Sequence, residues 1–315
     1  MNKNKVIKIA IIVAAIIIFL LKVVIPSIRY NEAIALMNEG KYEEAMTVFG
    51  TLYGYKDSYK QESACRTIIN DKAYDEAVTL TNEGKYEEAL AAFDALDGYR
   101  DSAGKARTLL NFQQIKAAEV GDYIKLGGDG YWRQIYDTSY YDTKYDVEWL
   151  VLEREGNKLF VISKYVLDYK LYNDKIESVT WETCTLRKWL NGTFLDKTFS
   201  ELEQRLIQTT EVPADKNPDY GTSQGEATND RIFILSIDEA NKYFASDKAR
   251  ICENDNGDAC SWWLRSPGVI QQVAACVITN GKIDSYGDVY DWGWQYEVTY
   301  VPKGVRPAMW IDLDA

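Results

Sequence analysis

The chain of 315 residues contains no histidine. Imidazole is the general base of Ser-His-Asp and Cys-His nucleophiles and a ligand in three-histidine iron sites and many zinc sites, so its absence excludes those classes of site. The five cysteines are odd in number and include no C-x-x-C pair, so they define neither a zinc site nor a disulfide framework. Cys252 and Cys260 could close one loop in an oxidising compartment, and free buried thiols are the alternative.

Only one apolar run is long enough to cross a bilayer. Residues 6–25 are apolar apart from Lys8 and Lys22. At about 1.5 Å of rise per residue, such a helix covers roughly 30 Å, the thickness of the hydrocarbon core. Because no small-residue cleavage site follows, we expect an uncleaved single-pass anchor; a removed secretion signal is the alternative.

Acidic residues are missing from the first 29 positions, which contain five lysines and arginines. This bias predicts a cytoplasmic amino terminus, residues 1–5, and a remainder outside the cell membrane. That remainder has 31 basic and 48 acidic residues, a net charge of −17. Because this charge repels phosphates, we expect no nucleic-acid partner.

An internal repeat follows the apolar run. Residues 30–58 recur at 74–102 with 18 of 29 positions identical. In each copy, apolar positions at helical spacing flank a glycine, Gly40 or Gly84, which predicts a helical hairpin. Helix caps are also expected at equivalent positions of the two copies: C-caps at Gly54 and Gly98, and N-caps at Asp57/Ser58 and Asp101/Ser102.

The shared sequence G-K-Y-E-E-A-x-x-x-F-x-x-L resembles the second helix of tetratricopeptide repeats, and the resemblance covers residues 30–111. The period of 44 residues departs from that family's 34, and there are two copies where about three make a stable stack. We therefore expect residues 26–117 to be a helical spacer. A partner-binding scaffold is the alternative.

After residue 117 the sequence changes to short apolar runs separated by turn residues, which predicts a second domain, 118–315, of mixed α+β class. Two helices are expected, over 186–195 and 201–208. Strands are expected over 123–126, 147–152, 158–163, 231–235, 273–279 and 307–313.

Five landmarks in this domain have a family character. They are E-W-L-V-L at 148–152, T-L-R-K-W-L-N at 185–191, F-I-L-S at 233–236, W-W-L-R-S-P-G at 262–268 and G-V-R-P-A-M-W-I at 304–311. Together they resemble an uncharacterised domain of Gram-positive bacteria, over nearly all of 119–315. The W-L-R-S-P and V-R-P-A-x-W pair is also similar to the formylglycine-generating-enzyme branch of the C-type-lectin-like fold. This resemblance implies a compact mixed domain with long binding loops and no established activity.

The landmark residues themselves are expected to be structural. No nucleophile with an evident base is recognisable, so we expect no enzyme, with a two-carboxylate wall hydrolase as the alternative. Trp262, Trp263 and Leu264 are predicted to be core, while Arg187, Arg265 and Arg306 are predicted to anchor loops by hydrogen bonds.

Residues 284–297 interleave aromatic rings with acids. Aromatic faces stack on pyranose rings and carboxylates accept hydroxyl hydrogen bonds, so this loop predicts a carbohydrate, wall-polymer or surface-protein ligand. A hairpin packed on the core is the alternative, and the aromatic segment 131–145 is a second such loop. The predicted ligand-binding residues are Tyr286, Asp288, Tyr290, Asp291, Trp292, Trp294 and Tyr296.

Residues 253–258 form an oxygen-rich turn around Gly257. Calcium prefers such oxygen ligands, which makes Asp255 and Asp258 candidate metal ligands, although runs of this kind also serve as solvated turns. We expect no other cofactor.

Overall fold

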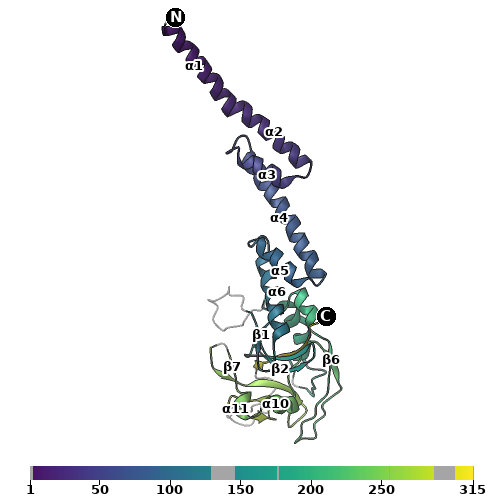
Figure 1. Cartoon of the computed structure of the whole chain (residues 1–315). Helices are drawn as coiled ribbons and strands as arrows, with labels where there is room; N and C mark the ends of the chain where they lie inside the picture. Colours follow the sequence, from purple (N-terminus) through teal and green to yellow (C-terminus); the bar gives the residue numbers. More distant parts are fainter. Residues whose placement is uncertain (1–2, 129–145, 176, 255, 287–301, 315) are drawn as a thin grey trace. The chain divides into compact units, whose positions relative to one another are not determined.

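The computed structural model describes residues 3–128, 146–175, 177–254, 256–286 and 302–314 (Figure 1). The chain combines helices and strands, as the predicted α+β class requires. It divides into two compact units, Met1–Leu110 and Asn111–Ala315.

The first unit begins with one long apolar helix. It consists of α1 (Lys3–Phe19), a π-helical segment η1 (Leu20–Val24) and α2 (Ile25–Asn38). Pro26 lacks the N–H that would bond to the carbonyl of Lys22, and the wider π-helical turn directly before it accommodates this break. The helix is long and apolar enough to cross a membrane, as an anchor or a signal sequence does.

Two helical hairpins follow, as predicted from the repeat. The helices are α3 (Tyr42–Gly50), which pairs with α2, α4 (Ser58–Asn82), α5 (Tyr86–Ala95), which pairs with α4, and α6 (Ser102–Ala117). Gly40 and Gly84 have φ of +77° and +73° at the two hairpin turns, a conformation that glycine adopts without strain. The core of the first hairpin contains Ala33, Ala45, Phe49, Leu52 and Cys65.

The predicted C-caps at Gly54 and Gly98 are wrong, whereas the predicted N-cap position at Asp57 is confirmed. Helices α3 and α5 have their C-caps at Thr51 and Leu96, so Gly54 and Gly98 instead lie in the turns that follow. Asp57 is the N-cap residue of α4 but makes no capping hydrogen bond. One of its carboxylate oxygens accepts from the Tyr30 hydroxyl, and the other accepts from the Gln61 side-chain amide at 2.9 Å. The hydroxyls of Ser58 and Ser102 are buried without a hydrogen-bond partner.

An equivalent tyrosine–aspartate hydrogen bond occurs within each copy of the repeat. The Tyr30 hydroxyl donates to Asp57, and the Tyr74 hydroxyl donates to Asp101, each 27 residues further along. Each tyrosine ring also meets a buried phenylalanine edge to face, with centroids 5.6 Å apart in the first copy and 5.7 Å in the second. The repeat is therefore a repeated set of contacts as well as a repeated sequence.

This contact makes the stability of the first hairpin depend on pH. The hydrogen bond from Tyr30 holds the pKa of Asp57 below its ordinary value of 3.8, with a smaller effect from Gln61. A lowered pKa in the folded state stabilises the fold above the unfolded pKa, and this contribution is lost as the pH falls through the folded pKa. The melting temperature of the parent should fall between about pH 5 and about pH 3, and we expect it to fall less in Tyr30→Phe, which lacks this hydrogen bond.

The measurement is the helical circular-dichroism melt of the whole chain in detergent at both pH values. Tyr59→Phe is the matched control, because the Tyr59 side chain is 61% exposed. Equal pH dependence in the parent and in Tyr30→Phe would contradict the assignment.

The second unit contains two main sheets. The first has the order β1 (Tyr123–Lys125), β2 (Glu148–Glu155), β3 (Lys158–Ser163) and β13 (Ala308–Asp312), antiparallel throughout. The second has the order β11 (Ile283–Asp284), β10 (Ala274–Val277), β9 (Trp262–Pro267), β12 (Lys303–Val305) and β4 (Asp168–Lys170), with β9 and β12 parallel. Arg306 and Pro307 carry the chain from one sheet to the other.

Short elements complete this unit. The helical segments are α7 (Thr185–Trp189), the π-helical η2 (Leu190–Phe194), α8 (Leu195–Thr198), α9 (Glu201–Leu206), α10 (Ile237–Tyr243) and α11 (Asp247–Arg250). Two hairpins pair β5 (Thr210–Val212) with β6 (Thr228–Asp230) and β7 (Cys252–Glu253) with β8 (Ala259–Cys260). Ser200 and Glu203 form a capping box at α9, which confirms the predicted start of that helix.

The predicted strand over 231–235 is wrong. Only Phe233 makes an isolated bridge, to Ala308. Side chains bind several of the other backbone groups: the N–H of Ile232 donates to the Asn191 amide oxygen at 3.1 Å, and the Arg265 side chain donates to the carbonyl of Ile234 at 3.0 Å. The carbonyl of Leu235 accepts from the backbone N–H of Arg265 at 2.9 Å. The apolar run is buried as expected, but its backbone bonds are divided between side chains and isolated contacts with β9 and β13, so no continuous strand ladder forms.

Candidate functional site

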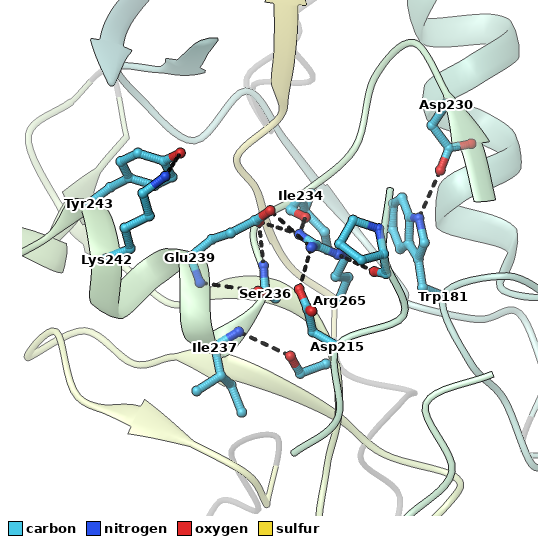
Figure 2. Close-up of polar contacts among 12 residues, drawn as sticks. Trp181, Asp215, Asp230, Ile234, Ser236, Ile237, Glu239, Lys242, Tyr243 and Arg265 are labelled. Carbon is cyan, nitrogen blue, oxygen red and sulfur yellow. Dashed lines mark hydrogen bonds and ion pairs between the residues drawn. The ribbon is translucent and has the colours of Figure 1, made fainter. Parts of the chain in front are cut away.

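Arg265 lies at the centre of the polar network in Figure 2. Its side chain is 1% exposed, although it belongs to the apolar strand β9. Nε donates to the carbonyl of Pro213 at 3.4 Å, Nη1 to the carbonyl of Ile234 and to Glu239, and Nη2 to Asp215 at 2.6 Å and to Glu239 at 2.9 Å. The whole guanidinium fork is therefore occupied, which confirms the predicted anchoring role.

Glu239 is itself held in place by the start of α10. The backbone N–H of Ser236 donates to the Glu239 carboxylate at 3.0 Å, and the N–H of Glu239 donates back to the Ser236 hydroxyl at 3.1 Å (Figure 2). The next N–H, of Ile237, donates to the Ser266 hydroxyl at 3.0 Å. This capping box therefore positions the carboxylate that Arg265 binds.

Asp230 organises a second buried network. One carboxylate oxygen accepts from the Trp181 indole at 2.9 Å and from the Thr228 hydroxyl at 2.7 Å, while the other accepts from Arg187 at 2.7 Å. Arg187 thus anchors a loop, as predicted. In the Arg265 network and in the Asp230 network, the hydrogen bonds join different segments of the chain. Both networks therefore hold loops in place.

The buried Arg306 differs because no carboxylate pairs with it among the residues that the structure describes. Its Nε donates to the carbonyl of Ser163 at 3.0 Å, and its guanidinium lies between the rings of Phe244 and Trp262, with centroid distances of 5.0 and 5.2 Å. Burial lowers the pKa of Arg306. The hydrogen bond and the two rings tie the link between β12 and β13 to the core, again as predicted.

Residues 213–227, between β5 and β6, are held by hydrogen bonds to other segments of this unit. Arg265 donates to Pro213 and Asp215 at the start of the segment. Further along, the buried Asn217 donates to the carbonyl of Pro267 at 2.8 Å and to the Ser285 hydroxyl at 2.9 Å. Thr222 donates to the carbonyl of Gly268 at 2.8 Å. The segment therefore lies beside Ser285, close to the start of the predicted ligand loop.

Tyr220, at the surface of this segment, meets Tyr286. Their rings lie edge to face with centroids 6.3 Å apart, and their hydroxyls are 3.4 Å apart. Tyr286 is 50% exposed. The hydrogen bond to Tyr286 raises the pKa of Tyr220, and the carboxylates of Asp219 and Asp284 raise it further. Two aromatic rings and two carboxylates thus share one region of the surface, which we call the tyrosine–acid surface.

Of the predicted ligand-binding residues, the structure describes Tyr286. The other six, Asp288, Tyr290, Asp291, Trp292, Trp294 and Tyr296, lie outside the described residues, as does the second aromatic loop at 131–145. Tyr220 was missed because no local pattern links it to Tyr286, 66 residues away.

The predicted calcium turn joins β7 and β8. The side-chain oxygen of Asn254 accepts the backbone N–H groups of Asn256 at 3.0 Å and Asp258 at 2.9 Å, as in other Asx turns. Asp258 is exposed, and Asp255 lies outside the described residues. Among the residues that the structure describes, no group of three or more His, Cys, Asp and Glu side chains could hold a metal ion. The calcium site stays a prediction.

All five cysteine side chains are buried, and none of them forms a disulfide. Cys252 and Cys260 are direct partners across the β7–β8 hairpin, and Cys260 Sγ lies 2.7 Å from the Tyr169 hydroxyl. Burial raises the pKa of the Cys252 thiol. A protonated, buried thiol is a poor nucleophile, so these groups act as core residues in this structure.

Residues 156–313 match the model of a family described as "Domain of unknown function (DUF6273)". No curated protein and no solved structure matches the chain.

Proposed function

The chain belongs to this DUF6273 family, and we propose that it is a membrane-anchored recognition protein that binds carbohydrate at the tyrosine–acid surface. The observation that carries this proposal is the pairing of Tyr220 with Tyr286 beside Asp219 and Asp284. Exposed rings offer apolar faces to a pyranose, and carboxylates accept its hydroxyl hydrogen bonds.

The loop that continues from Tyr286 would enlarge this surface. Residues 287–297 contribute further rings and acids in the sequence, including Trp292 and Trp294. Tryptophan presents the largest ring face of any side chain, so these two residues are our strongest candidates for stacking on a sugar. The ligand we propose is an uncharged or weakly charged glycan or wall polymer, because the net charge of −17 over residues 30–315 disfavours strongly anionic chains.

In this proposal, α1 and the helical hairpins determine where the second unit is placed. In this proposal α1 anchors the protein, its positive flank keeps the amino terminus in the cytoplasm, and the rest of the chain faces outward from a Gram-positive cell. The tetratricopeptide-like hairpins act as a spacer, and the second unit is a lectin-like domain without catalytic activity. Short helical arrays bury little surface of their own, which favours a spacer over a peptide-binding groove.

A glycan array tests the proposal. The whole protein should bind a defined set of saccharides, and Trp292→Ala with Trp294→Ala should abolish this binding while the near-ultraviolet circular dichroism of the buried tryptophans is retained. Capture of a protein partner by residues 26–117, without glycan binding, would instead support a scaffold. Turnover of wall glycan by the parent would support a carboxylate hydrolase.

A further inference from the structure

The turn between α3 and α4 lies against the long apolar helix where η1 passes into α2 (Figure 1). The Tyr55 hydroxyl is 3.5 Å from the carbonyl oxygen of Val23, and Arg29 Nη1 is 3.5 Å from the Thr51 hydroxyl. Val23 is two residues before the end of the apolar run at residue 25. If α1 crosses a bilayer, this turn is therefore level with the boundary between hydrocarbon and headgroups.

The turn and the first residues of α4 expose two aromatic side chains. Tyr53 is 85% exposed and Tyr59 is 61% exposed. Tyr59 lies over the turn itself, because a Cβ added to Gly54 would come within 2.7 Å of its ring. Lys56 and Lys60 are also exposed, so the turn combines rings with positive charge. This is the composition of membrane–water interfaces, where tyrosine rings and basic side chains reside at headgroup level.

The second copy of the repeat provides an internal comparison. Its equivalent turn has nearly the same backbone, with φ of 47° at Asp97 against 47° at Tyr53, and 53° at Arg100 against 51° at Lys56. The fold of the turn therefore does not require a tyrosine. Yet the two tyrosines of the first copy correspond to Asp97 and Ala103 in the second.

The two turns also differ in charge, the first being more basic and the second more acidic. Residues 50–60 contain two lysines and one aspartate, whereas residues 94–104 contain one arginine and three aspartates. The aromatic and basic version is the one that contacts the apolar helix. The two turns share a backbone conformation but differ in the aromatic rings and charges that they expose. This difference indicates that their surroundings differ.

We propose that the α3–α4 turn rests in the headgroup layer of the bilayer that α1 crosses, with Tyr53 and Tyr59 inserted and with Lys56 and Lys60 near lipid phosphates. The proposal rests on the anchor in the proposed function. The contact would give the first hairpin a second attachment to the membrane beside α1, and so limit its rotation about the helix axis.

Quenching by brominated lipids tests this contact. The whole chain would be placed in phosphatidylcholine–phosphatidylglycerol vesicles, with and without bromine near the top of the acyl chains. All nine native tryptophans lie between residues 132 and 310, so they give the same background in each variant. The emission added by Tyr53→Trp should fall by about half or more in brominated lipid, because an interfacial ring lies beside the bromine. The matched control, Asp97→Trp, should be unaffected.

The outcomes separate this contact from the anchor. Unquenched Tyr53→Trp emission from an intact, vesicle-bound chain would overturn the contact and leave the anchor standing. A mature protein without its apolar run, detected by mass spectrometry, would overturn both.

A second variant gives the first turn the residues of the second copy, through Tyr53→Asp, Tyr59→Ala and Lys60→Gly. This chain should keep its helical melting temperature. An added Thr51→Trp in that chain should be quenched less than Thr51→Trp alone, and equal quenching would also overturn the contact.

Discussion

Replacing Arg265 with methionine is expected to lower the free energy of unfolding of the second unit by about 3–5 kcal/mol. Methionine fills similar space but leaves the carboxylates of Asp215 and Glu239 without their buried cation, and the carbonyl of Ile234 without this donor. Removing one partner of a buried network costs more than the network contributes as a whole, since the remaining charge stays desolvated.

Urea unfolding followed by tryptophan fluorescence measures this change, because every tryptophan lies in the second unit. Arg265→Lys should give a smaller but clear loss, since one ammonium group cannot replace a two-armed fork. Lys242→Ala is the control: Lys242 is 59% exposed in its ion pair with Glu153, and the expected cost is below about 1 kcal/mol. Arg265→Met with the midpoint of the parent would show that the network is dispensable.

The second large effect is expected at Asp230. Asp230→Ala removes the common acceptor of Trp181, Thr228 and Arg187, so a buried indole N–H and a buried hydroxyl lose their partners together. We expect a loss of about 3 kcal/mol, near the lower end for a buried pair because Arg187 is partly exposed.

A double-mutant cycle can assign that loss. Trp181→Phe should be costly in the parent and much less costly in Asp230→Ala, because the indole N–H is then already unpaired. Glu211→Ala serves as the control on the same β5–β6 hairpin, where the exposed side chain should contribute less than about 0.5 kcal/mol. Additive effects of the two changes would contradict a shared network.

The parts of the fold that could be predicted are those with short-range causes. The helical hairpins follow from a repeated apolar spacing, and their holding contact joins residues only 27 positions apart. The burial of Trp262, Trp263 and Leu264 follows from their composition, and all three are fully buried. The anchoring of Arg265 was predicted from the chemistry of the guanidinium group, without its partners.

What could not be predicted depends on partners distant in sequence. Residues 231–235 have the composition of a strand, but the side chains of Asn191 and Arg265, from 31 to 41 positions away, bind several of their backbone groups. The start of α10 was missed although S-x-x-E at 236–239 is a readable capping signature. At the candidate site, composition alone singled out Tyr286, whereas Tyr220 reaches it only through the hydrogen bonds of Asn217 and Thr222.

The most direct test of carbohydrate recognition is the affinity of the bilayer-embedded protein for a saccharide selected on the array, compared between the parent, Tyr286→Ala and Tyr123→Ala. Tyr123 is a matched control because it is 53% exposed and belongs to β1, in a different sheet from Asp284 on β11. We predict that Tyr286→Ala weakens binding about tenfold, the loss of one ring contact of roughly 1.4 kcal/mol, while Tyr123→Ala binds as the parent does. Equal affinities for the parent and Tyr286→Ala would contradict recognition at this surface.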